Sequence, residues 1–80
     1  MGWKFEYKDS FKDDLNKIVF NHAQDVLLYL NREIGAREDP RSVGSEIGDL
    51  WRYKTNGMAI TVKIVDEESK IIVYTVIPSP

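Results

Sequence analysis

Hydrophobic and polar residues alternate with a period of two in the last third of the chain, which predicts three strands joined by two tight turns. The segments are Leu50–Thr55, Met58–Val65 and Lys70–Ile77. Asn56-Gly57 joins the first two segments, and this dipeptide favours a type I′ turn because both central residues need positive φ. Asp66-Glu67-Glu68-Ser69 provides the second turn. The pattern therefore predicts an antiparallel β-meander.

The two turns determine which side chains share a face of the sheet, because successive side chains of a strand point to opposite faces. A two-residue first turn places Tyr53 opposite Ile60. A four-residue second turn places Ile60 opposite Thr75 and Thr61 opposite Tyr74. One face is then apolar and bears Trp51, Tyr53, Met58, Ile60, Val62, Ile64, Ile71, Val73 and Ile77. The other face is mixed and bears Arg52, Lys54, Ala59, Thr61, Lys63, Ile72, Tyr74 and Val76.

The first half of the chain predicts a strand followed by two helices. Trp3–Tyr7 alternates aromatic and charged residues, as a half-buried strand does, and Asp9-Ser10 offers a helix N-cap. Apolar spacing predicts a first helix over residues 11–19. Asn21 and Gln24 resemble a capping box, so a second helix beginning at His22 is expected, with one continuous helix as the alternative. Its apolar stripe consists of Ala23, Val26, Leu27, Leu30 and Ile34.

The second helix is expected to end at Gly35, a C-terminal cap, and a loop to follow from Arg37 to Asp49. The order is then β-α-α-β-β-β over one domain spanning residues 1–80. This order predicts an α+β fold, in which an antiparallel helical hairpin covers the apolar face of the meander. Pro78-Ser79-Pro80 should end the last strand, because proline cannot donate a hydrogen bond to the sheet.

Composition limits the classes of function. The formal net charge of −2 argues against an overall nucleic-acid binder, so any basic surface must be local. The chain has no cysteine, which leaves no disulfide framework and no cysteine metal site. The charged N-terminal residues Lys4 and Glu6 do not suit a signal peptide, and no apolar run is long enough to span a membrane. A cytoplasmic protein without membrane contact is therefore expected.

The order of elements, together with several local motifs, resembles the RelE/ParE toxin superfamily. The similarity covers most of the chain, from the helix beginning Ser10-Phe11-Lys12-Asp13-Asp14-Leu15 through the loop Asp39-Pro40-Arg41-Ser42-Val43-Gly44. Its most specific part is Leu50-Trp51-Arg52-Tyr53-Lys54, followed by Gly57 and by a strand that ends in Asp66-Glu67. The resemblance implies a small toxin encoded beside a cognate antitoxin. RelE-like members cut mRNA in the ribosomal A site, and ParE-like members poison gyrase.

A RelE-like activity implies metal-independent RNA cleavage without a cofactor. By this resemblance Arg52, Lys54 and Tyr74 are the candidate catalytic residues, and Arg52, Lys54 and Lys63 are the candidate RNA-binding residues. Two departures predict weak or absent nuclease activity. Ala59 stands where the family commonly has an arginine, and Pro78-Ser79-Pro80 stands where a basic, proton-donating tail is expected. The loop between Gly44 and Trp51 is also a few residues shorter than in the family.

Other interpretations of the same residues stay open. In the alternative interpretation, the three cations keep a sheet face solvated and Tyr74 is a surface aromatic. The sole histidine, His22, suits a helix cap or the surface. Two alternative functions remain. The first is an active ribosome-dependent endonuclease with mRNA and the ribosome as partners, which uses Arg52, Lys54, Lys63 and Tyr74. The second is a non-catalytic module. The latter binds an antitoxin segment or a second copy.

Overall fold

The central hairpin of the sheet has the predicted register. In the computed structural model, which describes residues 3–78, β3 (Leu50–Thr55) and β4 (Met58–Val65) pair antiparallel. Trp51 lies opposite Val62 and Tyr53 opposite Ile60. Asn56 and Gly57 have φ values of 48° and 74°, so the predicted turn with two positive φ angles is confirmed.

The second hairpin follows the predicted register only as far as Val62. β5 (Lys70–Pro78) pairs antiparallel with β4, and Val73 lies opposite Val62 as expected. A bulge then leaves Tyr74 without a partner, so Thr75 lies opposite Thr61 and Val76 opposite Ile60. The predicted pairs Ile60–Thr75 and Thr61–Tyr74 are therefore wrong.

The bulge also corrects the assignment of the last residues to the two faces, because one extra residue exchanges the faces beyond it. Val76 is buried at 1% exposure, whereas Ile77 is 45% exposed. Pro78 is still part of β5 and pairs with Met58. Ser79 and Pro80, which were expected to end the strand together with Pro78, lie outside the described residues.

Two further strands complete a five-stranded mixed sheet with the order β1-β5-β4-β3-β2. β1 (Lys4–Tyr7) pairs parallel with β5, a partner that the sequence pattern did not identify. β2 (Ser45–Ile47) pairs antiparallel with β3 inside the segment predicted to be a loop. β2 has only three residues, all exposed, so it has no apolar alternation by which to recognise it.

Both helices begin earlier than predicted, and α1 also ends earlier. α1 spans Asp9–Asn16 and α2 spans Phe20–Tyr29, and a π-helical turn over Leu30–Ile34 extends α2. Lys8 and Val19 are the N-caps and neither uses its side chain, so the predicted caps at Asp9-Ser10 and Asn21 are wrong. Val19 has φ −59° and ψ 140°, which excludes one continuous helix. Gly35 follows the helical segment but keeps a right-handed φ of −68°.

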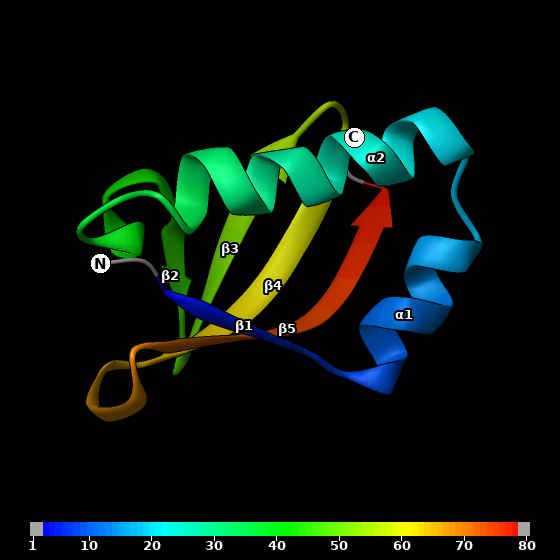
Figure 1. Cartoon of the computed structure of the whole chain (residues 1–80). Coiled ribbons are helices and arrows are strands. Elements are labelled where there is room, and N and C mark those ends of the chain that lie inside the picture. Colours follow the sequence, from blue (N-terminus) through cyan, green and yellow to red (C-terminus); the bar gives the residue numbers. More distant parts are fainter. Residues whose placement is uncertain (1–2, 79–80) are drawn as a thin grey trace.

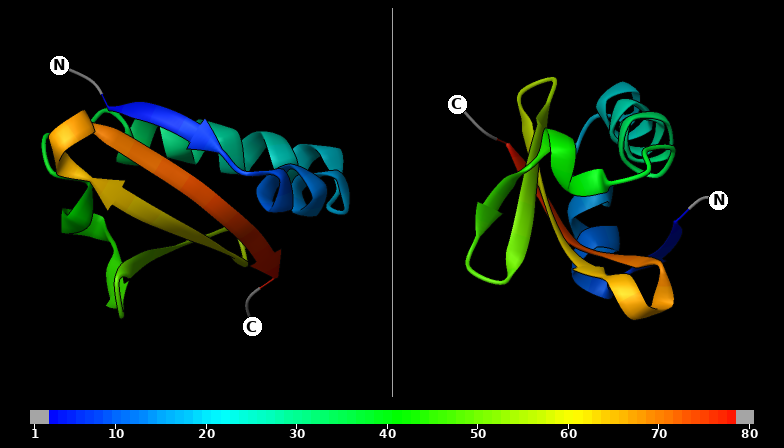
Figure 2. Two further views of the ribbon diagram at one scale, coloured as in Figure 1. Left: turned by 90° about the horizontal axis from the view of Figure 1, so that it is seen from below. Right: turned by 90° about the vertical axis from the view of Figure 1, so that its left-hand side faces the viewer.

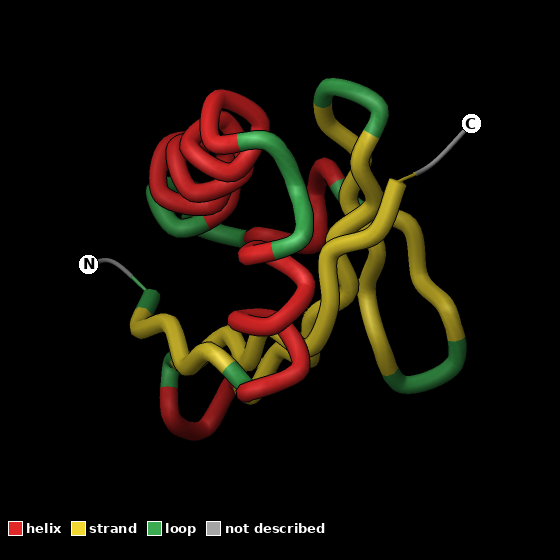
Figure 3. The backbone as a smooth tube through the Cα atoms, turned by 90° about the vertical axis from the view of Figure 1, so that its right-hand side faces the viewer, coloured by secondary structure: helices red, strands yellow, loops and turns green. Residues whose placement is uncertain are grey.

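Both helices lie on one face of the sheet, and no helix of residues 3–78 lies over the other face (Figures 1, 2 and 3). α1 packs chiefly on β5 and crosses the direction of α2 in Figure 1. The predicted α+β fold is confirmed. The helix-covered face encloses the core, whose buried residues are Phe11, Val26, Leu30, Ile34, Tyr53, Met58, Ile60, Val62, Ile71, Val73 and Val76. Within residues 3–78, no helix is long and apolar enough to cross a membrane.

Candidate nucleic-acid interface

The three candidate RNA-binding cations share the helix-free face of the sheet. Arg52 and Lys54 lie on β3, opposite Thr61 and Ala59 of β4 respectively. Lys63 lies two residues beyond Thr61 on the same strand, so it is a diagonal neighbour of Arg52, with their Cα atoms about 7–8 Å apart. The strand pairing therefore brings all three cations together, which we call the cationic face.

None of the three cations has an acidic partner among the described residues. The acids whose ion pairs the structure records lie elsewhere, and Glu6 is an example, with Lys70 at 3.2 Å and Lys8 at 3.3 Å. The hydrogen bonds from these lysines lower the pKa of Glu6. Asp66 lies 2.6 Å from Arg41 at the turn between β4 and β5. The positive charge of the cationic face is thus not neutralised by these pairs.

Arg52 is the most enclosed of the three cations. Its side chain is half-buried, whereas Lys54 and Lys63 are exposed. Its Nε atom is buried and has no hydrogen-bond partner in the described part of the chain. Because buried polar groups usually have a partner, this guanidinium has lost hydration at Nε without gaining an acceptor there. An anion bound at its outer nitrogens can compensate for part of this loss.

The bulge sets Tyr74 apart from the cations. Tyr74 is half-buried and has no partner across β4, where Thr75 takes the expected place opposite Thr61. Its backbone carbonyl oxygen accepts a 2.6 Å hydrogen bond from the Ser10 hydroxyl of α1. α1 thereby holds the backbone of β5 at the bulge, a contact between residues far apart in the sequence.

Two other residues singled out from the sequence have clear positions. Ala59, where the resemblance suggests an arginine, lies between Lys54 and Ile77 on the helix-free face and is 3% exposed. A side chain at this position therefore adjoins the cationic face. His22 is exposed on α2, on the helix-covered side of the sheet, and is not part of that face.

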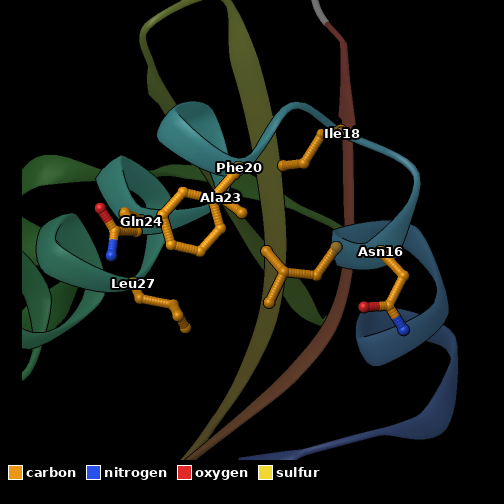
Figure 4. Close-up of a pocket in the computed structure, with 7 residues that line it drawn as sticks. Asn16, Ile18, Phe20, Ala23, Gln24 and Leu27 are labelled. Atoms are coloured by element: carbon orange, nitrogen blue, oxygen red, sulfur yellow. The ribbon is translucent and has the colours of Figure 1, made fainter.

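The sequence did not predict an open apolar pocket between the end of α1 and the start of α2 (Figure 4). Its volume is about 470 Å³, and its lining includes Leu15, Ile18 and Leu27. Phe20 also lines it and is 71% exposed, beside Val19 at 65% exposure. The available signal was Phe20 itself, an aromatic residue outside the apolar stripes of both predicted helices.

Comparison with known proteins gives structural matches but no sequence matches. No protein-family model matches the chain, and no curated protein matches it by sequence. A chain of the toxin–antitoxin complex RelBE2 from Mycobacterium tuberculosis matches with a TM-score of 0.88 at 13% identity, over 98% of this chain and 92% of that chain. Isolated RelE toxin from E. coli matches with a TM-score of 0.75 at 11% identity, over 98% and 85%.

A third match comes from an archaeon. A chain of the RelE–RelB complex from Pyrococcus horikoshii superposes with a TM-score of 0.76 at 15% identity, over 98% of this chain and 96% of that chain. The identities are low, whereas the superpositions include nearly all of this chain. The chain therefore has the fold of the RelE toxins, as the resemblance predicted.

Proposed function

We propose that the chain is the toxin-type member of a RelE-like toxin–antitoxin pair and that its cationic face contacts the phosphates of ribosome-bound mRNA. The observation that carries the proposal is the clustering of Arg52, Lys54 and Lys63, without acidic partners in the described residues, on the open face of a RelE-type fold. Phosphate contacts need clustered cations and hydroxyl donors rather than base-specific groups.

We propose further that nuclease activity is weak or absent. In cleavage by RNA's own 2′-hydroxyl, the 2′-oxygen attacks phosphorus and the bond to the 5′-oxygen breaks. A base must take the 2′ proton, cations must stabilise the crowded phosphate, and an acid must protonate the leaving 5′-oxygen. Arg52 and Lys54 suit the second task, and Tyr74 is the remaining candidate for the third.

Ala59 is the main support for low activity, because a methyl group cannot stabilise the developing negative charge. Loss of one charge-stabilising donor typically lowers a rate by about 10²–10³-fold, and loss of acid–base assistance by about 10²–10⁴-fold. These factors need not multiply, but either one leaves little activity. Tyr74 lies on the bulge and not opposite Thr61, so it is offset from the row of residues that contains Arg52.

Primer extension on mRNA loaded in ribosomes tests this proposal, with the purified wild type compared with Arg52→Ala and Tyr74→Phe. We expect the wild type to produce few or no A-site cuts in this assay. Robust A-site cuts that disappear in Tyr74→Phe would instead establish an active endonuclease. Cuts that persist in Tyr74→Phe but disappear in Arg52→Ala would show that cations suffice for catalysis.

We propose an antitoxin as the protein partner. Two of the three matched structures described above are toxin–antitoxin complexes, and this chain exposes apolar side chains beside the pocket between α1 and α2. Co-expression with the product of the adjacent reading frame should give a stable complex that suppresses any growth arrest. Growth arrest that requires Arg52 and Lys54 supports action on RNA. If the chain forms this complex on co-expression but causes no growth arrest when it is expressed alone, the result favours the non-catalytic binding module.

A further inference from the structure

A transverse row of polar residues crosses four strands on the helix-free face. Ser45 of β2 lies opposite Arg52 of β3, Arg52 lies opposite Thr61 of β4, and Thr61 lies opposite Thr75 of β5. Residues paired in this way share a face, so Ser45 and Thr61 flank the Arg52 side chain and Thr75 follows Thr61 in the same row. The row depends on the bulge, because without the extra residue Tyr74 would occupy the place of Thr75.

The hydroxyl groups of this row are available to a ligand. Ser45 is exposed, and Thr61 and Thr75 are half-buried. None of the side-chain hydrogen bonds recorded within residues 3–78 involves these three hydroxyls. The buried Nε of Arg52 also lacks a partner there. The four polar side chains of the row thus have hydrogen-bond donors available to a ligand, and no carboxylate belongs to the row.

We infer that the row Ser45–Arg52–Thr61–Thr75 is a binding site for the phosphodiester backbone of single-stranded RNA, with Thr61 and Thr75 as direct hydroxyl donors. Serine and threonine hydroxyls are common donors to phosphate oxygens, and arginine binds phosphate through two parallel N–H groups. Four strands set about 4.8 Å apart give the row a length of roughly 14 Å. This length admits more than one phosphate, so the backbone crosses the strands, between Lys54 on one side and Lys63 on the other.

This inference rests on the proposed function, because it specifies how the cationic face holds RNA. The contributions of hydroxyls and of cations to RNA affinity can be distinguished by their dependence on salt concentration. A cation that neutralises a phosphate releases a counterion, and for single strands each such contact contributes about −0.7 to the slope of log affinity against log salt. A hydroxyl is uncharged, so its removal lowers affinity at every salt concentration but leaves the slope unchanged.

The experiment measures the fluorescence anisotropy of a labelled single-stranded oligoribonucleotide at several salt concentrations, with the full-length chain. The variants are Thr61→Val, Thr75→Val and Lys63→Ala. Thr55→Val is the matched control, since Thr55 lies opposite the buried Met58 and outside the row. Thermal unfolding of each variant checks that it is folded. Inorganic phosphate is added as a competitor, to distinguish binding of a free ion from binding of the RNA backbone.

We expect Thr61→Val and Thr75→Val each to weaken binding by about 3- to 10-fold with an unchanged salt slope. Lys63→Ala should reduce the slope by about 0.7, and Thr55→Val should match the wild type. Wild-type affinity in both threonine variants, together with weakened binding in Lys63→Ala, would refute the hydroxyl row but keep the proposed function. No binding by the wild type would overturn both. Displacement of the labelled RNA by millimolar inorganic phosphate would identify a site for the free anion and would also contradict the inference.

Discussion

The Tyr53 hydroxyl donates a buried hydrogen bond of 2.8 Å to the carbonyl oxygen of Pro40. Tyr53 is 1% exposed in the centre of β3, and Pro40 begins the 3₁₀ turn that precedes β2. This bond therefore ties the core of the sheet to the segment that leads to its edge. Tyr53→Phe should cost roughly 1–3 kcal/mol in the free energy of unfolding, because the Pro40 carbonyl loses its partner. Urea denaturation measures the loss.

The same hydroxyl should make stability depend on alkaline pH. Burial raises the pKa of Tyr53 to about 12 from the ordinary value of 10.0. The folded chain thus holds this proton more tightly than the unfolded chain, and the resulting stability is present in full below about pH 10 and is lost as the pH rises toward about 12. The difference in unfolding free energy between wild type and Tyr53→Phe should shrink over that range. A constant difference would contradict the assignment.

Val62 and Thr61 are adjacent on β4 but face opposite sides of the sheet. Val62 is fully buried at 0% exposure, and Thr61 is half-buried on the helix-free face. Val62→Ala should lower the free energy of unfolding by about 1–3 kcal/mol, because it removes buried methyl groups and leaves a cavity. Thr61→Ala should change it far less. Equal losses in the two variants would argue against this orientation of β4.

Gly44 is required for space and not for its backbone angles. Its φ of −106° suits any residue, but a Cβ atom there would lie 2.8 Å from Cε1 of Tyr53. The Tyr53 ring cannot easily move aside, since it is buried and its hydroxyl is bound to Pro40. Gly44→Ala should cost about 1–3 kcal/mol, as expected for overpacking. In a Tyr53→Leu background, Gly44→Ala should cost less than it does in the wild type, because the clash with the ring is absent there.

Gly57 illustrates the opposite case, in which the backbone conformation is decisive. Its φ of 74° lies in a region that β-branched residues strongly disfavour. Gly57→Val should lower the thermal midpoint clearly, while Asn56→Gly should be tolerated because glycine accepts the φ of 48° found there. Wild-type stability of Gly57→Val would contradict the type I′ turn on which the hairpin register depends.

Ala59→Arg should strengthen RNA binding. The new guanidinium would stand on the helix-free face beside Lys54, within the cationic face. We expect higher affinity for single-stranded RNA and a salt slope steeper by about 0.7. Ala36→Arg is the matched control, because Ala36 is exposed after the helical segment and does not belong to any strand of the cationic face. If the affinity for RNA rises equally in both variants, the effect comes from net charge and not from the position of the arginine.

Local sequence signals predicted the central hairpin well. Asn56-Gly57 fixed a turn of known length, and alternation then determined the partners of Trp51 and Tyr53. The bulge at Tyr74 was not predictable in this way, because Ile72, Val73, Val76 and Ile77 are all apolar and fit either face. The parallel pairing of β1 with β5 depends on contacts between residues distant in the sequence. The edge strand β2 depends on backbone pairing alone. Neither feature leaves a periodic pattern in the sequence.

The same distinction applies to the candidate site. Arg52, Lys54 and Lys63 were placed together by strand alternation, and the structure has them on one face. The row formed with Ser45 and Thr75 could not be inferred, since Ser45 was assigned to a loop and Thr75 was assigned the wrong partner. Both errors concern backbone structure, namely a missed strand and a missed bulge, and not the chemistry of the side chains.

The parallel pairing of β1 with β5 also bears on how the protein is made. Phe5 pairs with Ile71, so the first strand of the chain pairs with the last. During synthesis β1 has no partner until β5 has left the ribosome, and α1, which packs on β5, has little to pack on before then. Such long-range pairing delays folding until the chain is nearly complete. Unfinished chains that end before Lys70 would therefore lack the assembled sheet and the face it presents.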